Sequence, residues 1–309
     1  MAPPNTDSGP WTIARLLSWT REHLARAGVE SPRLCAEILL AHAMHCERLQ
    51  LYTQYDRVPD EEVLAPFRKA VRQAARGQPV AYLTGRKEFF SLSFEVTPEV
   101  LIPRPETEIL VERTIDLVRR SSGTVRSILD LGTGSGCIAV SLALHLPEVS
   151  ICASDISEAA LAVARRNAER HKVGARIEFA LGDLFEPWTG RPGRPDAATR
   201  FDAIVSNPPY VSTDPEAPVE QSVRRFEPQV ALMAGPEGLD VIRRLVIESP
   251  RHLTAGGHLL MEIGFDQAER VRALLEAGGW QDILGYRDGA GYLRVFHARR
   301  PVDSAGQTG

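Results

Sequence analysis

The spacing of hydrophobic residues changes part of the way along the chain. In the first quarter, from about residue 11 to residue 76, apolar residues recur three and four positions apart, as at Ile13, Leu16, Leu17, Val63, Phe67 and Val71. This spacing places apolar side chains on one face of a helix and predicts a small helical bundle. Apolar residues then partly alternate with polar ones between Phe89 and Val96, which predicts a β-hairpin before Pro98.

From residue 127 onward, short apolar strands alternate with amphipathic helices. We expect the strands at residues 128–131, 151–156, 177–180, 203–206, 259–263 and near Val295. Such alternation predicts an α/β fold of Rossmann type, a parallel sheet covered by helices on both faces. The pattern divides the chain into a helical domain (1–85), a hairpin linker (86–103), the α/β domain (104–300) and a disordered tail (301–309).

A glycine-rich turn follows the first strand of the predicted sheet. Its residues are Gly132, Thr133, Gly134, Ser135 and Gly136, and a helix follows directly. Such a turn lets the backbone approach a bound adenosyl compound, and the helix N-terminus presents free N–H groups. Cys137 stands where a dinucleotide fingerprint still has one more residue before its last glycine, which disfavours a nicotinamide cofactor.

Acidic residues end the next two predicted strands. Asp155 is placed to accept hydrogen bonds from both hydroxyls of a ribose. Asp183 can accept from an adenine amino group, while Leu184 and Phe185 would pack on the ring. Each acid alone is more often a surface or capping carboxylate. Together, at the carboxyl ends of successive parallel strands, they predict an adenosyl site.

The fourth predicted strand leads into Asn207, Pro208, Pro209 and Tyr210. An amide or amino-heterocycle nitrogen is a poor nucleophile, so a site that methylates one must fix its orientation. The Asn207 side-chain oxygen and the Pro208 carbonyl can accept from its two N–H bonds, and consecutive prolines restrict the backbone. Tyr210 can stack on the planar group. We therefore predict that Asn207, Pro208 and Tyr210 are catalytic and that all four residues bind the substrate.

Composition excludes several other classes of function. The net charge is −4, and residues 1–85 hold ten basic and nine acidic residues, so no stable nucleic-acid partner is expected. The four cysteines form no CxxC pair, which indicates a reducing compartment. No signal-like or long apolar segment is present, so we expect a cytoplasmic protein without a membrane partner. His42, His45 and Cys46 lack a second ligand pair, and we expect no metal.

Several motifs of the chain resemble those of known methyltransferases. The segments DLGTGSG (residues 130–136) and NPPY (residues 207–210) resemble motifs of class I enzymes that act on amides and amines. LIPRPETE (residues 101–108), RFEP (residues 225–228) and EIG (residues 262–264) resemble segments of the HemK/PrmC family, the release factor glutamine methyltransferases. The resemblance spans about residues 12–298. It implies a class I methyltransferase domain preceded by a small helical bundle domain and a β-hairpin.

This resemblance also implies a reaction and a set of site residues. The enzyme would use S-adenosyl-L-methionine, without a metal, to methylate the glutamine side-chain amide nitrogen (N5) in the Gly-Gly-Gln motif of class I peptide chain release factors. S-adenosyl-L-homocysteine would be the product, and the N-terminal domain would grip the release factor. The cofactor would contact residues 132–136, Asp155, Asp183, Leu184 and Asn207, and residues 207–210 would hold the glutamine. Glu106 and Phe226 would flank the pocket.

Three alternatives are weighed against this function. A sister enzyme methylates glutamine on a large-subunit ribosomal protein and shares the NPPY motif, although its counterpart of residues 103–108 differs. An exocyclic-amine methyltransferase of DNA or RNA acts on a similarly planar amino group, but it needs a basic recognition region, and residues 1–85 carry a charge of only +1. A cofactor-binding protein without catalysis would leave residues 207–210 without a role.

Overall fold

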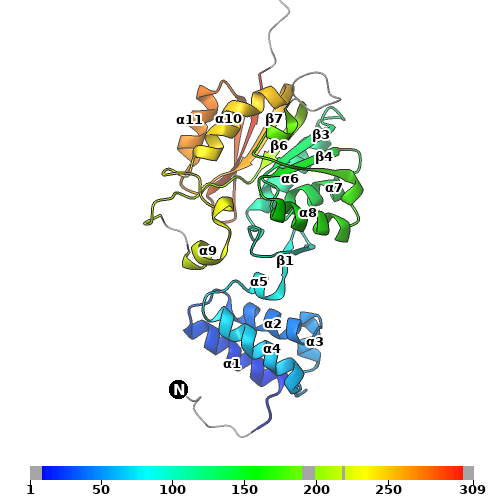
Figure 1. The fold of residues 1–309 in the computed structure, drawn as a ribbon, viewed down its shortest axis with the longest axis vertical. Coiled ribbons are helices and arrows are strands. Elements are labelled where there is room, and N and C mark those ends of the chain that lie inside the picture. Colours follow the sequence, from blue (N-terminus) through cyan, green and yellow to red (C-terminus); the bar gives the residue numbers. More distant parts are fainter. Residues whose placement is uncertain (1–8, 190–198, 218–219, 302–309) are drawn as a thin grey trace, which may run out of the picture. The chain divides into compact units, whose positions relative to one another are not determined.

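The chain folds into two compact units (Figure 1). The computed structural model describes residues 9–189, 199–217 and 220–301. One unit contains residues 1–86 together with residues 221–226, and the other contains residues 87–220 and 227–309. Apart from Pro301, the tail expected at residues 301–309 lies outside the described residues.

The first unit is helical, as the spacing of its apolar residues predicts. Its helices are α1 (Ile13–Arg26), α2 (Pro32–Ala43), α3 (Arg48–Thr53), α4 (Glu61–Ala74), α5 (Val80–Thr84) and α9 (Gln221–Phe226). The Thr12 and Asp60 side chains cap α1 and α4 by accepting from the backbone N–H groups of Arg15 and Val63. Helices α1 to α5 share one apolar core, whose buried members include Ile13, Leu24, Leu39, Leu40, Leu51, Phe67 and Val71.

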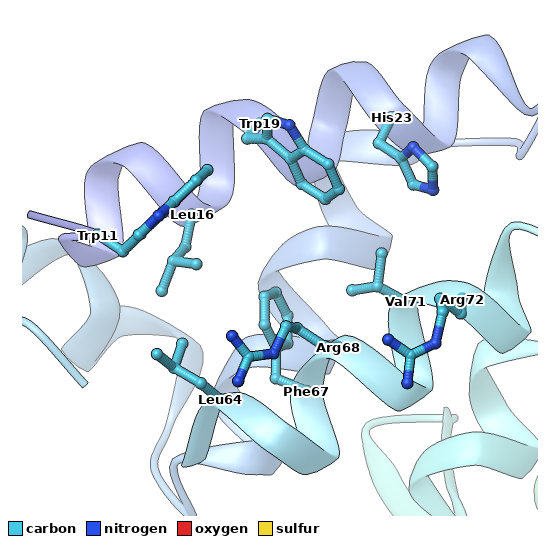
Figure 2. Close-up of a pocket in the computed structure, with 9 residues that line it drawn as sticks. All are labelled: Trp11, Leu16, Trp19, His23, Leu64, Phe67, Arg68, Val71 and Arg72. Atoms are coloured by element: carbon cyan, nitrogen blue, oxygen red, sulfur yellow. The ribbon is translucent and has the colours of Figure 1, made fainter. Parts of the chain in front are cut away.

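A groove of about 350 Å³ lies between α1 and α4 (Figure 2). It is lined by Trp11, Leu16, Trp19, His23, Leu64, Phe67, Arg68, Val71 and Arg72. Trp11 and Trp19 are 39% and 36% exposed, and their rings meet edge to face with centroids 6.3 Å apart. Trp19 also stacks on His23. The groove therefore offers large aromatic surface to solvent, which is typical of protein interaction sites.

A β-hairpin opens the second unit, as the alternation of apolar residues predicts. Its strands are β1 (Arg86–Phe89) and β2 (Leu92–Glu95). The two residues between them, Phe90 and Ser91, both have positive φ angles, the conformation that closes a tight two-residue hairpin turn. The backbone N–H of Phe90 donates to the Glu108 side chain at 2.8 Å, which fixes the turn to the following helix.

A seven-stranded sheet forms the centre of the second unit, in the order β5-β4-β3-β6-β7-β9-β8. Its strands are β3 (Ser127–Leu131), β4 (Ser150–Asp155), β5 (Ile177–Leu181), β6 (Phe201–Ser206), β7 (Leu253–Glu262), β8 (Gln281–Arg287) and β9 (Leu293–Arg299). The strands from β5 to β7 are parallel, as predicted.

The far edge of the sheet differs from the sequence-based expectation of a wholly parallel sheet. β9 runs antiparallel to β7, and β8 runs antiparallel to β9. β8 was not predicted, because this edge strand is largely exposed, has Gly285 in its interior and lacks a clear alternation of apolar and polar residues. Edge strands have only one hydrogen-bonded neighbour and do not need an apolar pattern to pair with it.

Helices cover both faces of the sheet and bury two apolar cores. One core includes residues of α6 (Thr107–Arg120), α7 (Cys137–His145) and the hairpin, and helix α8 (Glu158–Arg170) packs beside α7. The other core includes residues of α10 (Asp240–His252) and α11 (Ala268–Ala277). Short 3₁₀ turns occur at Gly174–Arg176, Glu186–Trp188 and Gln229–Ala231. Within the described ranges, no helix has the length and apolarity needed to span a membrane.

Asn167 of α8 links the hairpin to the glycine-rich turn. Its side-chain oxygen accepts from the Glu95 N–H at 2.7 Å, and its amide donates to the carbonyls of Glu95 and Ser135 at 2.9 and 2.8 Å. The Asn167 side chain is fully buried, and its bond to the Ser135 carbonyl is buried as well, whereas the two bonds to Glu95 are partly buried. One side chain therefore fixes the turn against both α8 and β2.

We predict that Asn167→Leu lowers the free energy of unfolding by about 3 kcal/mol, because it leaves three backbone groups, one buried and two partly buried, without their partners. Urea unfolding monitored by circular dichroism measures this change. Arg166→Ala, which removes the neighbouring exposed ion pair with Glu95, should cost less than about 1 kcal/mol. Equal losses in the free energy of unfolding for the two variants would show that the hydrogen bonds of Asn167 do not make the larger contribution to stability.

Candidate active site

The carboxyl ends of four neighbouring strands lie in line. In the register of the sheet, Leu131 pairs with both Ser154 and Ser206, and Ser206 pairs with Met261. The chain leaves β3 toward β4 on one side and returns to β6 on the other, and such a reversal opens a ligand-binding crevice at the carboxyl ends. Each of these four aligned residues is followed in the sequence by a residue at this crevice. These residues are Gly132, Asp155, Asn207 and Glu262.

The glycine-rich turn is held tightly against its neighbours. Gly132, Gly134 and Gly136 all have positive φ angles, between 55° and 79°. A Cβ atom on Gly136 would lie 3.1 Å from the Ala164 Cα of α8, so a larger residue would separate the turn from that helix. Around Gly132 there is open space instead. The turn thus meets the requirements of a backbone surface that a ligand approaches closely.

Asp155 lies beside this turn, as its place after β4 predicts. Its two carboxylate oxygens accept from the backbone N–H groups of Gly134 and Ser157, at 2.8 and 2.9 Å. Burial raises the pKa of Asp155, and these two N–H groups oppose the shift. Each oxygen has a second lone pair, so the carboxylate can still accept from the two hydroxyls of a ribose.

Asp183 and Leu184 lie after β5, in positions that differ in detail from the expectation. The Asp183 carboxylate is partly exposed and accepts from the Arg244 guanidinium at 2.9 and 3.1 Å. Leu184 is half-buried. The expectation that Phe185 packs on an adenine ring is wrong, because its side chain is buried and stacks on His252 with centroids 4.5 Å apart. Phe185 therefore packs in the core beneath the loop that follows β5 and is not available to a ligand.

Asn207 is held by a chain of hydrogen bonds at the end of β6. Its Nδ2 donates to the Thr107 hydroxyl at 3.1 Å, and that hydroxyl donates to the Glu262 carboxylate at 2.6 Å. The Tyr210 hydroxyl donates to the other oxygen of Glu262 at 3.2 Å. The Asn207 Oδ1 is buried and has no hydrogen-bond partner among the described residues. Buried acceptors without partners are rare, and this one is available to a ligand.

The surroundings of Tyr210 complete this side of the site. Glu262 is fully buried, and burial raises its pKa to about 7, opposed by the Thr107 hydroxyl, the Arg294 charge and the Tyr210 hydroxyl. Burial and the nearby Glu262 charge also raise the pKa of Tyr210, so the phenol stays protonated at neutral pH. The Gln267 amide donates to the Tyr210 carbonyl at 2.9 Å and fixes the end of the segment. Pro208 is buried, and Pro209 is half-buried.

The structure thus brings residues 132–136, Asp155 and the segment 207–210 to one edge of the sheet. No role was predicted for Thr107 or Glu262 from the sequence, although both lie in segments that resemble family motifs. They are 155 residues apart and meet only through the fold. Glu106 directly precedes α6 beside this network, and Phe226 belongs to the helical unit. No group of three or more potential metal ligands occurs in the described part of the chain.

Comparison with known proteins gives the class. Residues 15–85 match the family model of the PrmC N-terminal domain, and residues 107–225 match that of the methyltransferase small domain. The catalytic domain of hMettl16 in complex with an RNA hairpin is 17% identical, with a TM-score of 0.52 over 82% of this chain and 85% of that one, which shows a shared fold. Fold and site together define a class I enzyme that uses S-adenosylmethionine as methyl donor, and the open glycine turn and Asp155 fit this cofactor.

Curated relatives give the family. The release factor glutamine methyltransferase of Rhodopirellula baltica is 43% identical over 303 residues, 97% of this chain and all of the relative. That of Geobacter sulfurreducens is 42% identical over 289 residues, 94% of this chain and 97% of the relative. The chain belongs to the release factor glutamine methyltransferase family, which confirms the resemblance drawn from its motifs.

Asp130 provides a test of the buried electrostatics below the glycine turn. It is fully buried, its carboxylate accepts from the Thr133 hydroxyl at 2.7 Å, and burial raises its pKa to about 7. Because the folded state binds this proton more tightly than the unfolded state, the contribution of Asp130 to stability is full below about pH 4 and is lost as the pH rises to about 7.

We predict that Asp130→Asn removes this dependence, since the amide oxygen can still accept from Thr133. The free energy of unfolding of the wild type minus that of the variant should fall by roughly 2–4 kcal/mol between pH 4 and pH 8. Urea titrations of both proteins at several pH values measure the difference. A difference that stays constant with pH would contradict the raised pKa.

Proposed function

We propose that this enzyme methylates the side-chain amide nitrogen, N5, of the glutamine in the Gly-Gly-Gln motif of class I peptide chain release factors. The observation that carries the proposal is the buried Asn207 Oδ1, an acceptor without a partner among the described residues at the crevice beside the glycine turn. A carboxamide brings the N–H donor that this oxygen lacks. Membership in the release factor glutamine methyltransferase family supports the same substrate.

In this proposal the segment 207–210 orients the substrate amide. S-adenosylmethionine, when bound, supplies an electrophilic methyl group on its sulfonium. The Asn207 Oδ1 accepts from one N–H of the glutamine and the Pro208 carbonyl from the other, while Tyr210 contacts the planar amide. Both acceptors favour the positive charge that grows on nitrogen during attack, so they stabilise the transition state more than the ground state. The proton leaves to water afterwards.

We further propose that the cofactor is held by residues 132–136, Asp155, Asp183, Leu184 and Asn207. Asp155 retains lone pairs for the ribose hydroxyls beside the bonds it already makes. The Asp183 carboxylate has lone pairs for an adenine amino group beyond the two bonds from Arg244. No metal takes part in this mechanism.

The helical unit is proposed to bind the release factor, with residues 1–85 as recognition domain, 86–103 as linker and 104–300 as catalytic domain in the cytoplasm. The groove between α1 and α4 suits this role. Its exposed aromatic rings supply contact area, and Arg68 and Arg72 on its rim favour a partner segment that carries carboxylates. Arg68 already pairs with Glu61, so Arg72 is the better candidate for this contact.

The reaction is tested with labelled S-adenosylmethionine and four separate substrates: a release factor, the same factor with its Gly-Gly-Gln glutamine changed to alanine, the ribosomal protein, and adenine-containing DNA. We expect label on the intact release factor alone. Asn207→Ala should lower kcat/KM by about 10²–10³, the loss typical of removing one transition-state hydrogen bond. Label on the ribosomal protein or on DNA would assign a different substrate, and a fully active Asn207→Ala would remove the proposed role of residue 207.

The groove is tested by comparing an intact release factor with a short Gly-Gly-Gln peptide. Trp19→Ala should raise KM for the intact factor about tenfold, because it removes a central aromatic contact. Its kinetics on the peptide should not change, since the peptide lacks the part of the release factor that is proposed to fill the groove. Leu49→Ala, at a 75% exposed apolar position outside the groove, is the matched control and should leave both substrates unaffected. An unchanged KM for Trp19→Ala would exclude the groove as the binding surface.

A further inference from the structure

One buried carboxylate is connected to both polar ends of the segment 207–210. Glu262 accepts from Tyr210 directly and from Thr107, which in turn accepts from Asn207. Glu262 is the last residue of β7, Thr107 is the first residue of α6, and the segment 207–210 directly follows β6. Glu262 and Thr107 are 0% and 1% exposed, so water does not compete for these hydrogen bonds.

In this series of hydrogen bonds, the group that accepts at one residue determines which group donates at the next. In its ionised form the Glu262 carboxylate can only accept, and in that form the Thr107 hydroxyl donates its single proton to it. The Thr107 hydroxyl then presents only lone pairs to Asn207. The Asn207 Nδ2 can donate to these lone pairs, whereas the Asn207 Oδ1 cannot. A flipped Asn207 would place its oxygen against the lone pairs of Thr107. The unflipped amide leaves Oδ1 as the atom without a partner among the described residues.

We infer that Glu262, acting through Thr107, is a positioning residue that keeps the Asn207 oxygen turned toward the substrate amide. This inference rests on the proposed function and assigns the specificity of the site for an N–H donor to two residues outside the segment 207–210. The same carboxylate holds the Tyr210 hydroxyl, so one group aligns both ends of the segment.

Helix α6 offers a matched pair of substitutions for the test. Thr107 and Thr114 are both buried, but the Thr114 hydroxyl donates to the Leu110 carbonyl of its own helix at 2.7 Å. Thr→Val conserves shape at either position and removes one hydroxyl. Thr107→Val should lower kcat/KM for the release factor about 10–100-fold, Thr107→Ser should restore it to within about threefold, and Thr114→Val should leave it unchanged.

Glu262→Gln tests the direction of these hydrogen bonds, because it changes the donor and acceptor groups of residue 262 without changing the shape of the side chain. A glutamine amide can donate to Thr107, which frees the Thr107 hydroxyl to donate to the oxygen of a flipped Asn207. We expect a loss similar to that of Thr107→Val. The double variant should lose no more than about threefold beyond either single variant, because the two residues act through one chain of bonds.

A second readout does not depend on turnover. Calorimetry of a Gly-Gly-Gln peptide binding to the enzyme with S-adenosylhomocysteine should show about tenfold weaker binding for Thr107→Val and wild-type binding for Thr114→Val. Equal kcat/KM and equal peptide affinity for the two valine variants, or additive losses in the double variant, would overturn the relay. The variants are compared on whichever substrate the wild type labels, so failure of the relay and failure of the proposed substrate are separate results.

Discussion

Parallel pairing of β3 with both β4 and β6 is the constraint on which the rest of the active site depends. The register sets Leu131 opposite Ser154 and Ser206, and β7 continues the line at Met261. Residues that are far apart in the chain therefore reach one edge of the sheet at the same level. A shift of one residue in any strand would turn its side chains to the other face and misplace the polar residue that follows it.

This edge concentrates polar groups that are costly to bury. Asp130, Glu262 and Thr107 are almost wholly inaccessible, and apolar cores on both faces of the sheet surround them. The cost is reduced because Glu262 accepts from Thr107 and Tyr210 with its two oxygens and Asp130 accepts from Thr133 with one of its oxygens, while the Asp130 Oδ1 has no hydrogen-bond partner among the described residues. The Asn207 oxygen lacks such a bond within the described ranges. The free-energy cost of leaving this oxygen unpaired is offset when a bound ligand donates a hydrogen bond to it.

The sequence predicts those parts of the fold and site that depend on neighbours in the chain. The glycine turn and the segment 207–210 carry their own conformational signals, and the strands from β3 to β7 carry apolar runs. The exposed strand β8 lacks such a signal, so the antiparallel edge was not predicted. The Thr107–Glu262 bond and the Arg244–Asp183 pair join residues 155 and 61 positions apart, and no local pattern reports such contacts. Phe185 was misassigned because its burial depends on His252 of α10.

The chemistry of an amide explains why such a site must fix the orientation of the substrate nitrogen. The lone pair of an amide nitrogen is delocalised, but once that nitrogen carries a methyl group and a positive charge its proton is strongly acidic and leaves to water. A strong general base therefore gains little, whereas two fixed acceptors both aim the nitrogen and stabilise its growing charge. Acceptors act in this way only if they cannot turn away. The prolines restrict the backbone of the segment, and the bonds through Thr107 to Glu262 restrict the Asn207 amide.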